Sequence, residues 1–410
     1  MKYRCRLFVV LILALITLIG SVAMALQKQI ISANKNIAYP FSPAVVAGGF
    51  VHISGTMATD DNGQLVPGDI REQTRRTLDR ISTLLKQAGS SLYETVSVQV
   101  YLRNAADFPA MNEIYRDYWN KYGNYVPART TVAANMVLPG ALIEVSVIAV
   151  TAVSKDKARL IALPSGWQPS PNPYSYGVKT GNTLFMSGLL ARNPKDNSLA
   201  ARDIRSQTRA VMENAGAILA AHHMTYADIV NSRVYITDKA DFQAMNEVYR
   251  SFFPVNPPAR ATVVAGLMSP DYLVEISFLA VRSEDRTAFT TPQEDGTAGH
   301  PNPNFSSAIR VGKRLYLSGM MGVKEANKGN AGLQTEETLA AIGRTLRIAG
   351  FDWAHVVDGV VYLTDMNDFQ AMNQAYRKTF HSEFPARATV GTGLVAPDGL
   401  VEIMLLAVKE

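Results

Sequence analysis

The chain has 410 residues, which exceeds one ordinary domain and suits about three domains of roughly 100–150 residues each. Its hydrophobic fraction of 47% is normal for globular domains, so each domain has enough apolar residues for a core. The formal net charge of +5 includes Lys2, Arg4 and Arg6 at the extreme N-terminus. The remaining charge of about +2, without a basic stripe interleaved with aromatic residues, argues against a nucleic-acid partner.

Residues 1–25 are predicted to form a secretory signal peptide. A short basic region leads into an apolar run over residues 7–20, and Ala23-Met24-Ala25 is typical of a signal peptidase site. We therefore expect a periplasmic or secreted protein that leaves the membrane after cleavage. The alternative is an anchor in the inner membrane formed by residues 7–26, since that stretch approaches spanning length. The only cysteine, Cys5, lies in this segment, so the mature protein is expected to have no disulfide and no cysteine metal ligand.

The rest of the chain consists of three copies of one pattern, which we place at residues 36–153, 170–282 and 300–410. The polar segments 154–172 and 283–304, rich in Pro, Gly and Ser, are expected to be linkers. Four sequence blocks recur in the same order and at similar spacing in every copy. They are a Ser-Gly pair, a D-F-x-A-M-N-x-x-Y-R block, a P-A-R-x-T-V block and an L-[IV]-E-[IV] block.

The first copy shows the elements expected of all three. Residues 50–54 alternate as a strand, and residues 69–88 form an amphipathic helix that ends at a glycine. A strand at 95–101, a helix at 107–122 and strands at 129–137 and 142–150 follow. This order predicts an α+β domain with two helices on one face of a mostly antiparallel sheet.

The second face of each sheet is apolar or small, and a single copy has nothing to cover it. Three copies packed around a three-fold axis would bury this face, and tandem fusion achieves that within one chain. We therefore expect an intramolecular pseudo-trimer that is a monomer in solution.

These blocks resemble the RidA/YjgF family over the whole chain after the signal segment. The resemblance implies chorismate-mutase-like domains with sites in the clefts between subunits, here between copies. It also implies hydrolysis of reactive 2-imino or enamino acids to 2-keto acids and ammonia, as by a 2-iminobutanoate/2-iminopropanoate deaminase, without a metal or cofactor. The six histidines show no ligand spacing that recurs between copies, in keeping with that expectation.

An arginine opens the P-A-R strand of every copy, at Arg129, Arg260 and Arg387. A guanidinium offers a planar fork that holds a carboxylate through two hydrogen bonds. The resemblance implies that this arginine binds the carboxylate of the imino or enamino acid. The alternative is a structural salt bridge.

A glutamate lies among apolar residues of the last strand, at Glu144, Glu275 and Glu402. Such a carboxyl must find a partner or shift its pKa. The resemblance implies a catalytic role, in which the glutamate positions the water that attacks the imine carbon. The alternative is an ion pair with the arginine of the same copy, and both interpretations are compatible.

Further substrate contacts are implied by the resemblance at two positions of each copy. They are the serines Ser54, Ser187 and Ser318, and the helix asparagines Asn112, Asn246 and Asn373. A strand-end turn is an equal alternative for the serines, and helix scaffolding for the asparagines.

The three copies differ at a position where family members often have a tyrosine that reaches the substrate. Copy two has Tyr174, whereas copies one and three have Phe41 and Phe305. The site that uses Tyr174 is therefore expected to be the best equipped. Thr131, Thr262 and Thr389 stand where some members have cysteine, and we expect them to supply backbone contacts. The alternative for the whole protein is a non-catalytic pseudo-trimer that binds small carboxylates or partner proteins.

Overall fold

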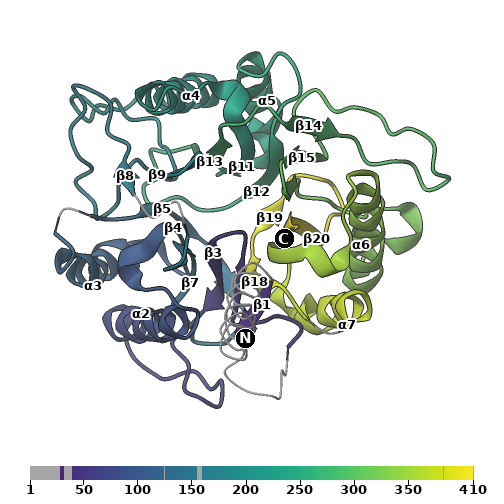
Figure 1. Cartoon of the computed structure of the whole chain (residues 1–410), viewed down its shortest axis with the longest axis horizontal. Coiled ribbons are helices and arrows are strands. Elements are labelled where there is room, and N and C mark those ends of the chain that lie inside the picture. Colours follow the sequence, from purple (N-terminus) through teal and green to yellow (C-terminus); the bar gives the residue numbers. More distant parts are fainter. Residues whose placement is uncertain (1–27, 32–38, 124, 155–158, 382, 410) are drawn as a thin grey trace, which may run out of the picture.

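Three domains of one design surround a common centre in the computed structural model, with helices outside and strands inside (Figure 1). The structure describes residues 28–31, 39–123, 125–154, 159–381 and 383–409. The expected signal peptide and membrane anchor lie outside these residues. Among the residues described, no helix is long and apolar enough to cross a membrane.

The elements follow the same order in each copy, except that the described part of the second has no counterpart of the short strands β6 and β19. The first domain contains β1 Gln29–Ile31, β2 Ala44–Ala47, β3 Phe50–Thr56, α2 Ile70–Gln87, β4 Thr95–Leu102, α3 Phe108–Asn120, β5 Ala128–Ala133, β6 Asn135–Met136 and β7 Ile143–Val150. The second contains β8 Leu160–Ile161, β9 Gly177–Thr180, β10 Thr183–Met186, α4 Ile204–Ala221, β11 Ile229–Ile236, α5 Phe242–Ser251, β12 Ala259–Val264 and β13 Val274–Val281. The third contains β14 Arg286–Phe289, β15 Ala308–Val311, β16 Arg314–Leu317, α6 Ala331–Ile348, β17 Val356–Leu363, α7 Phe369–Phe380, β18 Ala386–Gly391, β19 Gly393–Leu394 and β20 Val401–Val408.

The long first helix of each domain begins at a side chain that caps it. Asp69, Asp203 and Asn330 each accept a hydrogen bond from a backbone N–H three residues later. The face of α2 that carries Leu78, Ile81 and Leu85 is fully buried against the sheet. Apolar residues at helical spacing therefore fix which face of the helix is buried, as the sequence predicted.

Each sheet is mixed, which confirms the α+β design with two helices per sheet. The first sheet has the order β1-β2-β3-β7-β4-β5, in which only β4 and β5 run parallel. The other two domains repeat the parallel pair as β11–β12 and β17–β18. The strand that carries the arginine, β5, β12 or β18, is therefore the edge strand of its own domain's part of the sheet.

The segments expected to be linkers also contribute strands to the sheets. β8 pairs with β9, and β14 pairs with β15, so both segments add an edge strand to the domain that follows. Apolar residues such as Ile161 and Phe289 favour a short strand within these otherwise polar segments. The strands were not predicted because the composition of each whole segment is polar.

The inner faces of the three sheets meet in one shared apolar core. It includes the equivalent tyrosines Tyr101, Tyr235 and Tyr362, one from each domain, none of which is exposed. The hydroxyls of Tyr235 and Tyr362 lie 3.5 Å apart, so these strands approach one another at the centre. The face that one copy leaves uncovered is thus buried by the other two.

The ring of domains is closed by strand pairing between copies. β6 of the first domain pairs with β18 of the third, and β19 of the third pairs with β12 of the second. A bridge between Ala133 and Gly266 joins the first domain to the second. Each arginine strand therefore has its outer edge covered by another copy.

We expect the mature chain to be a monomer, because the inner faces and these sheet edges are already covered within one chain. Light scattering coupled to size exclusion should give the mass of a single chain over a wide range of concentrations. A stable trimer of chains would contradict the closed intramolecular ring.

Candidate functional site

Three equivalent sites lie where one domain's arginine strand meets the next domain's Ser-Gly turn. The backbone N–H of Arg129 donates to Ser187 Oγ at 2.8 Å, and the N–H of Gly188 donates to the Arg129 carbonyl at 3.2 Å. Arg260 donates in the same way to Ser318, and Arg387 to Ser54, both at 2.8 Å. We call these the Arg129 site, the Arg260 site and the Arg387 site. Each takes residues from two copies, as the resemblance implied.

The arginine of each site is buried in an aromatic cage. The guanidinium carbon of Arg129 lies 4.6 Å from the ring centre of Tyr115 and 5.5 Å from those of Phe108 and Tyr174. Phe108, Asn112 and Tyr115 share one face of α3, because they are spaced by four and three residues. The helix phenylalanine and tyrosine were not among the site residues predicted from the sequence. Their recurrence at this spacing in all three copies was the available signal.

The position of Tyr174 is structurally equivalent in the three sites. The ring of Phe305 lies 5.6 Å from the Arg260 guanidinium carbon, and the ring of Phe41 lies 5.5 Å from that of Arg387. Tyr174 alone adds a hydroxyl, which is hydrogen-bonded to Ser170, and burial raises the pKa of this phenol.

The guanidinium groups of the three arginines, each a planar fork of donors, differ in their hydrogen-bond partners. Arg260 and Arg387 each donate from Nη2 to the helix asparagine of their own copy, Asn246 and Asn373, at 2.7 Å. Within the part of the chain that the structure describes, all three guanidinium nitrogens of Arg129 lack a hydrogen-bond partner. The equivalent asparagine, Asn112, donates instead to Asn172 at 3.3 Å. The Arg129 fork is therefore the one whose donors are all unpaired, and we call it open in this sense; burial lowers the pKa of Arg129.

A buried glutamate faces each arginine strand from the neighbouring copy. Burial raises the pKa of Glu275 to about 8, against the opposing effects of a hydrogen bond from the Thr131 backbone and of the positive charge of Arg129. The pKa values of Glu144 and Glu402 are raised to about 8 for the same reason, and the Thr389 and Thr262 backbones supply the hydrogen bonds.

The glutamates do not pair with the arginine of their own copy. Within the described ranges no ion pair joins Glu144, Glu275 or Glu402 to any arginine. The arginine whose positive charge lowers the pKa of each glutamate belongs to another copy. The interpretation as an ion pair within one copy is therefore wrong. The reason is the ring arrangement, which places the last strand of one domain beside the arginine strand of another.

A glycine lies directly against each glutamate carboxylate. A Cβ at Gly188 would overlap Oε1 of Glu275, and the same holds for Gly55 with Glu144 and for Gly319 with Glu402. The glycine of the Ser-Gly pair is thus required by the close approach of the carboxylate.

Gly188→Ala is expected to displace the Glu275 side chain and to lower the free energy of unfolding by about 1–3 kcal/mol through overpacking. Thermal unfolding would measure this loss. Gly332→Ala, where an added Cβ makes only ordinary contacts, is the matched control. A wild-type thermal midpoint in Gly188→Ala would show that the carboxylate can move away without cost.

The serine of the Ser-Gly pair has a structural part in these interfaces. Ser187 is fully buried, and its hydroxyl donates to the Ser175 carbonyl at 2.5 Å while accepting from the Arg129 N–H. Ser54 and Ser318 make the corresponding two bonds. These bonds favour the structural interpretation of the serines, which connect the arginine strand to the next domain.

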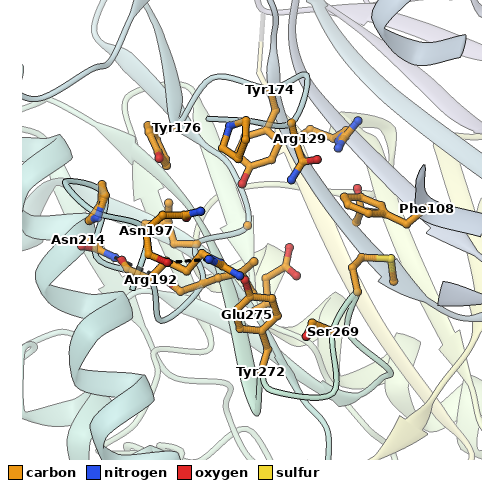
Figure 2. A pocket seen from close by; sticks show the side chains of 18 of the residues that line it. Phe108, Arg129, Tyr174, Tyr176, Arg192, Asn197, Asn214, Ser269, Tyr272 and Glu275 are labelled. Atoms are coloured by element: carbon orange, nitrogen blue, oxygen red, sulfur yellow. Dashed lines mark hydrogen bonds between the residues drawn. The ribbon is translucent and has the colours of Figure 1, made fainter. Parts of the chain in front are cut away.

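The Arg129 site opens into a cavity of about 240 Å³ (Figure 2). Arg129, Tyr174 and Glu275 line it, as expected of a substrate pocket. The remaining wall includes residues that the repeated blocks did not indicate, namely Trp167, Tyr176, Arg192, Asn197, Asn214 and Tyr272. Asn214 lies in α4 and the other five lie in linker or loop segments, and these positions differ between copies, so self-comparison of the sequence gave no signal for them. Among the described residues no group of three or more His, Cys, Asp or Glu is placed to hold a metal ion.

Comparison with known proteins gives the same threefold division. The family model described as Endoribonuclease L-PSP matches residues 32–151, 167–282 and 297–409. A RutC family protein of Saccharolobus solfataricus is 43% identical over 116 residues, which cover 28% of this chain and 92% of that protein. One from Pyrococcus horikoshii is 40% identical over 115 residues, covering 28% and 91%.

Two solved structures illustrate the likeness at different scales. E. coli TdcF, solved with bound serine, is 34% identical and covers 30% of this chain and 99% of its own, with a TM-score of 0.29. A chorismatase is 16% identical and covers 77% of this chain and 93% of its own, with a TM-score of 0.50. At that identity the likeness concerns the fold alone.

Proposed function

Since the chain belongs to the Endoribonuclease L-PSP family, which includes the RidA/YjgF proteins, through all three of its copies, we propose that it hydrolyses reactive 2-imino and enamino acids to 2-keto acids and ammonia. The observation that carries this proposal is the Arg129 site. A buried guanidinium that has no hydrogen-bond partner among the described residues and a carboxyl whose pKa is raised to about 8 line the same cavity.

The open fork of Arg129 suits the carboxylate of the substrate. A buried cation without a partner is costly, and a bound carboxylate would offset that cost through two charge-assisted hydrogen bonds. The rings of Phe108, Tyr115 and Tyr174 hold the guanidinium in place, so little side-chain entropy is lost on binding.

Glu275 is suited to the proton transfers of hydrolysis, because a carboxyl with a pKa of about 8 exchanges its proton near neutral pH. In its ionised form it takes a proton from water as the water oxygen bonds to the imine carbon. Glu275 passes that proton to the nitrogen of the tetrahedral adduct. It then takes the proton of the adduct's hydroxyl as the carbon–oxygen double bond forms, and this second proton goes to the nitrogen as the carbon–nitrogen bond breaks, so that ammonia and the 2-keto acid are released.

The Arg260 and Arg387 sites are proposed to contribute little to turnover. Their guanidinium forks are partly occupied by Asn246 and Asn373, and they carry Phe305 and Phe41 in place of the tyrosine. These observations favour a structural or binding role for two sites, with catalysis at the third. A ribonuclease role is not favoured by the net charge of +5, three of whose positive charges lie at the N-terminus.

The experiment couples an amino-acid oxidase to the purified mature protein and follows decay of the imine, trapped as its semicarbazone. We expect faster decay with the protein than without it. No acceleration with several amino acids, together with no effect of Arg→Ala at Arg129, Arg260 and Arg387, would refute the enzyme and leave the non-catalytic binding protein.

We also propose that the protein is exported, on the basis of the N-terminal sequence and the single cysteine at position 5. Mass spectrometry of the protein from periplasmic extracts would test this. A mature N-terminus at Leu26 is expected, and an intact N-terminus in the membrane fraction would indicate the anchor instead.

A further inference from the structure

A second arginine, Arg192, lines the same cavity as Arg129 and is held in place by its neighbours. Its Nε donates to the Tyr272 hydroxyl, and its Nη1 donates to the Asn197 carbonyl at 2.7 Å. The guanidinium also lies over the ring of Tyr272, 5.4 Å from the ring centre. The backbone carbonyl of Arg192 accepts from Asn214 Nδ2 at 2.8 Å. These contacts fix both the main chain and the side chain of Arg192.

Arg192 brings a positive charge that no described carboxylate neutralises. No ion pair joins it to an acidic residue in the described ranges, and no described hydrogen bond uses its Nη2. In Figure 2, Arg129 and Arg192 lie on different sides of the cavity, with the Glu275 carboxylate between them in this view. The cavity thus presents two guanidinium groups to one ligand.

The second arginine is peculiar to this site and is not part of the repeated scaffold. Arg192 stands five residues after Ser187, where the other copies have Thr59 and Val323. Its partner Tyr272 stands three residues before Glu275, where the other copies have Ala141 and Gly399. Arg192, Tyr272 and Tyr174 therefore occur together, in the one site whose first arginine fork is open.

We propose that the Arg129 site selects 2-imino acids with a second carboxylate at the end of the side chain, of the kind formed from acidic amino acids. This inference rests on the proposed function. Arg129 binds the carboxylate next to the imine carbon, and Arg192 binds the distal one with the donors that Tyr272 and Asn197 leave free. A neutral imino acid leaves the Arg192 charge unpaired in the cavity, which lowers its affinity for the site.

The test compares imines made in the assay from aspartate and glutamate with imines made from alanine and norvaline. We expect kcat/KM to be at least ~10-fold higher for the acidic imines. Arg192→Gln is expected to remove this preference by lowering kcat/KM for the acidic imines about 10-fold, while the neutral ones change less than about threefold. Arg205→Gln is the matched control, because it removes the same charge from a surface ion pair with Glu247.

A binding measurement separates the failure of this inference from the failure of the proposed function. Calorimetry with 2-oxoglutarate and with 2-oxopentanoate compares a diacid and a monoacid of equal chain length without any turnover. If 2-oxoglutarate binds more tightly, Arg192→Gln abolishes this difference and no imine is hydrolysed, then the preference for dicarboxylates is supported and the proposed deaminase activity is refuted. Hydrolysis without preference for acidic imines, or a preference that survives Arg192→Gln, would overturn the inference and leave the deaminase standing.

Discussion

Arg129→Met is expected to lower kcat/KM for imine hydrolysis at least ~100-fold, whereas Arg260→Met and Arg387→Met each keep activity within about threefold of the wild type. The substitution would remove the two charge-assisted hydrogen bonds that we propose for the substrate carboxylate, each worth roughly 1.5–3 kcal/mol. The other two arginines already bind Asn246 and Asn373, and their sites lack the tyrosine hydroxyl.

The same substitution is not expected to destabilise the fold. Arg129 is 3% exposed, and its nitrogens lack partners among the described residues, so methionine replaces a buried cation with an apolar chain that fits among the rings. The thermal midpoint of Arg129→Met should therefore equal or exceed that of the wild type.

Arg260→Met is the matched control for this experiment, because it removes an equivalent buried arginine from the same scaffold. Equal loss of activity in Arg129→Met and Arg260→Met would show that the sites are equivalent. A lowered thermal midpoint in Arg129→Met would assign the arginine a structural role.

The second large effect concerns pH. The free energy of unfolding is expected to fall as the pH rises from about 4.5 to about 8 and then to level off. The pKa values of Glu144, Glu275 and Glu402 are each raised by burial to about 8 in the folded chain, against 4.5 for an unperturbed glutamate. In this window the three carboxyls are ionised in the unfolded chain and protonated in the folded chain, so folding takes up protons. The free energy of unfolding therefore falls as the pH rises. Each glutamate contributes a slope of up to ~1.4 kcal/mol per pH unit.

Urea unfolding midpoints between pH 4 and pH 9 would measure this dependence. The triple variant Glu144→Gln, Glu275→Gln and Glu402→Gln should show a flatter profile and exceed the wild type in stability above pH 8, because glutamine does not ionise. Glu247→Gln, an exposed residue paired with Arg205, is the control and should keep the wild-type slope. A triple variant with the wild-type slope would show that these carboxyls are ionised in the folded protein.

The threefold repetition of the sequence allowed the main elements of the fold to be predicted. The helix at residues 69–88 and the strands at 95–101 and 142–150 agree with α2, β4 and β7 to within two residues, because alternation and helical spacing are local properties. β8 and β14 were not predicted, since a short edge strand depends on a neighbouring strand more than on its own composition.

The candidate site was predictable where it recurs. Arg129 and Glu275 stand out because their types are unusual for strands and return in every copy. Phe108 and Tyr115 repeat as faithfully, but helical spacing alone does not distinguish a cage around a cation from an ordinary core.

The sequence by itself determined the number of copies, their α+β design, and the arginine, glutamate and aromatic residue that each contributes. Only the tertiary structure decided which copies share a site. Arg129 meets Tyr174 and Glu275 of the next copy because β5 places its outer edge against that domain. It also decided that Arg192 and Tyr272 line the same cavity, since two loops of the second copy that are distant in sequence meet only when that domain folds.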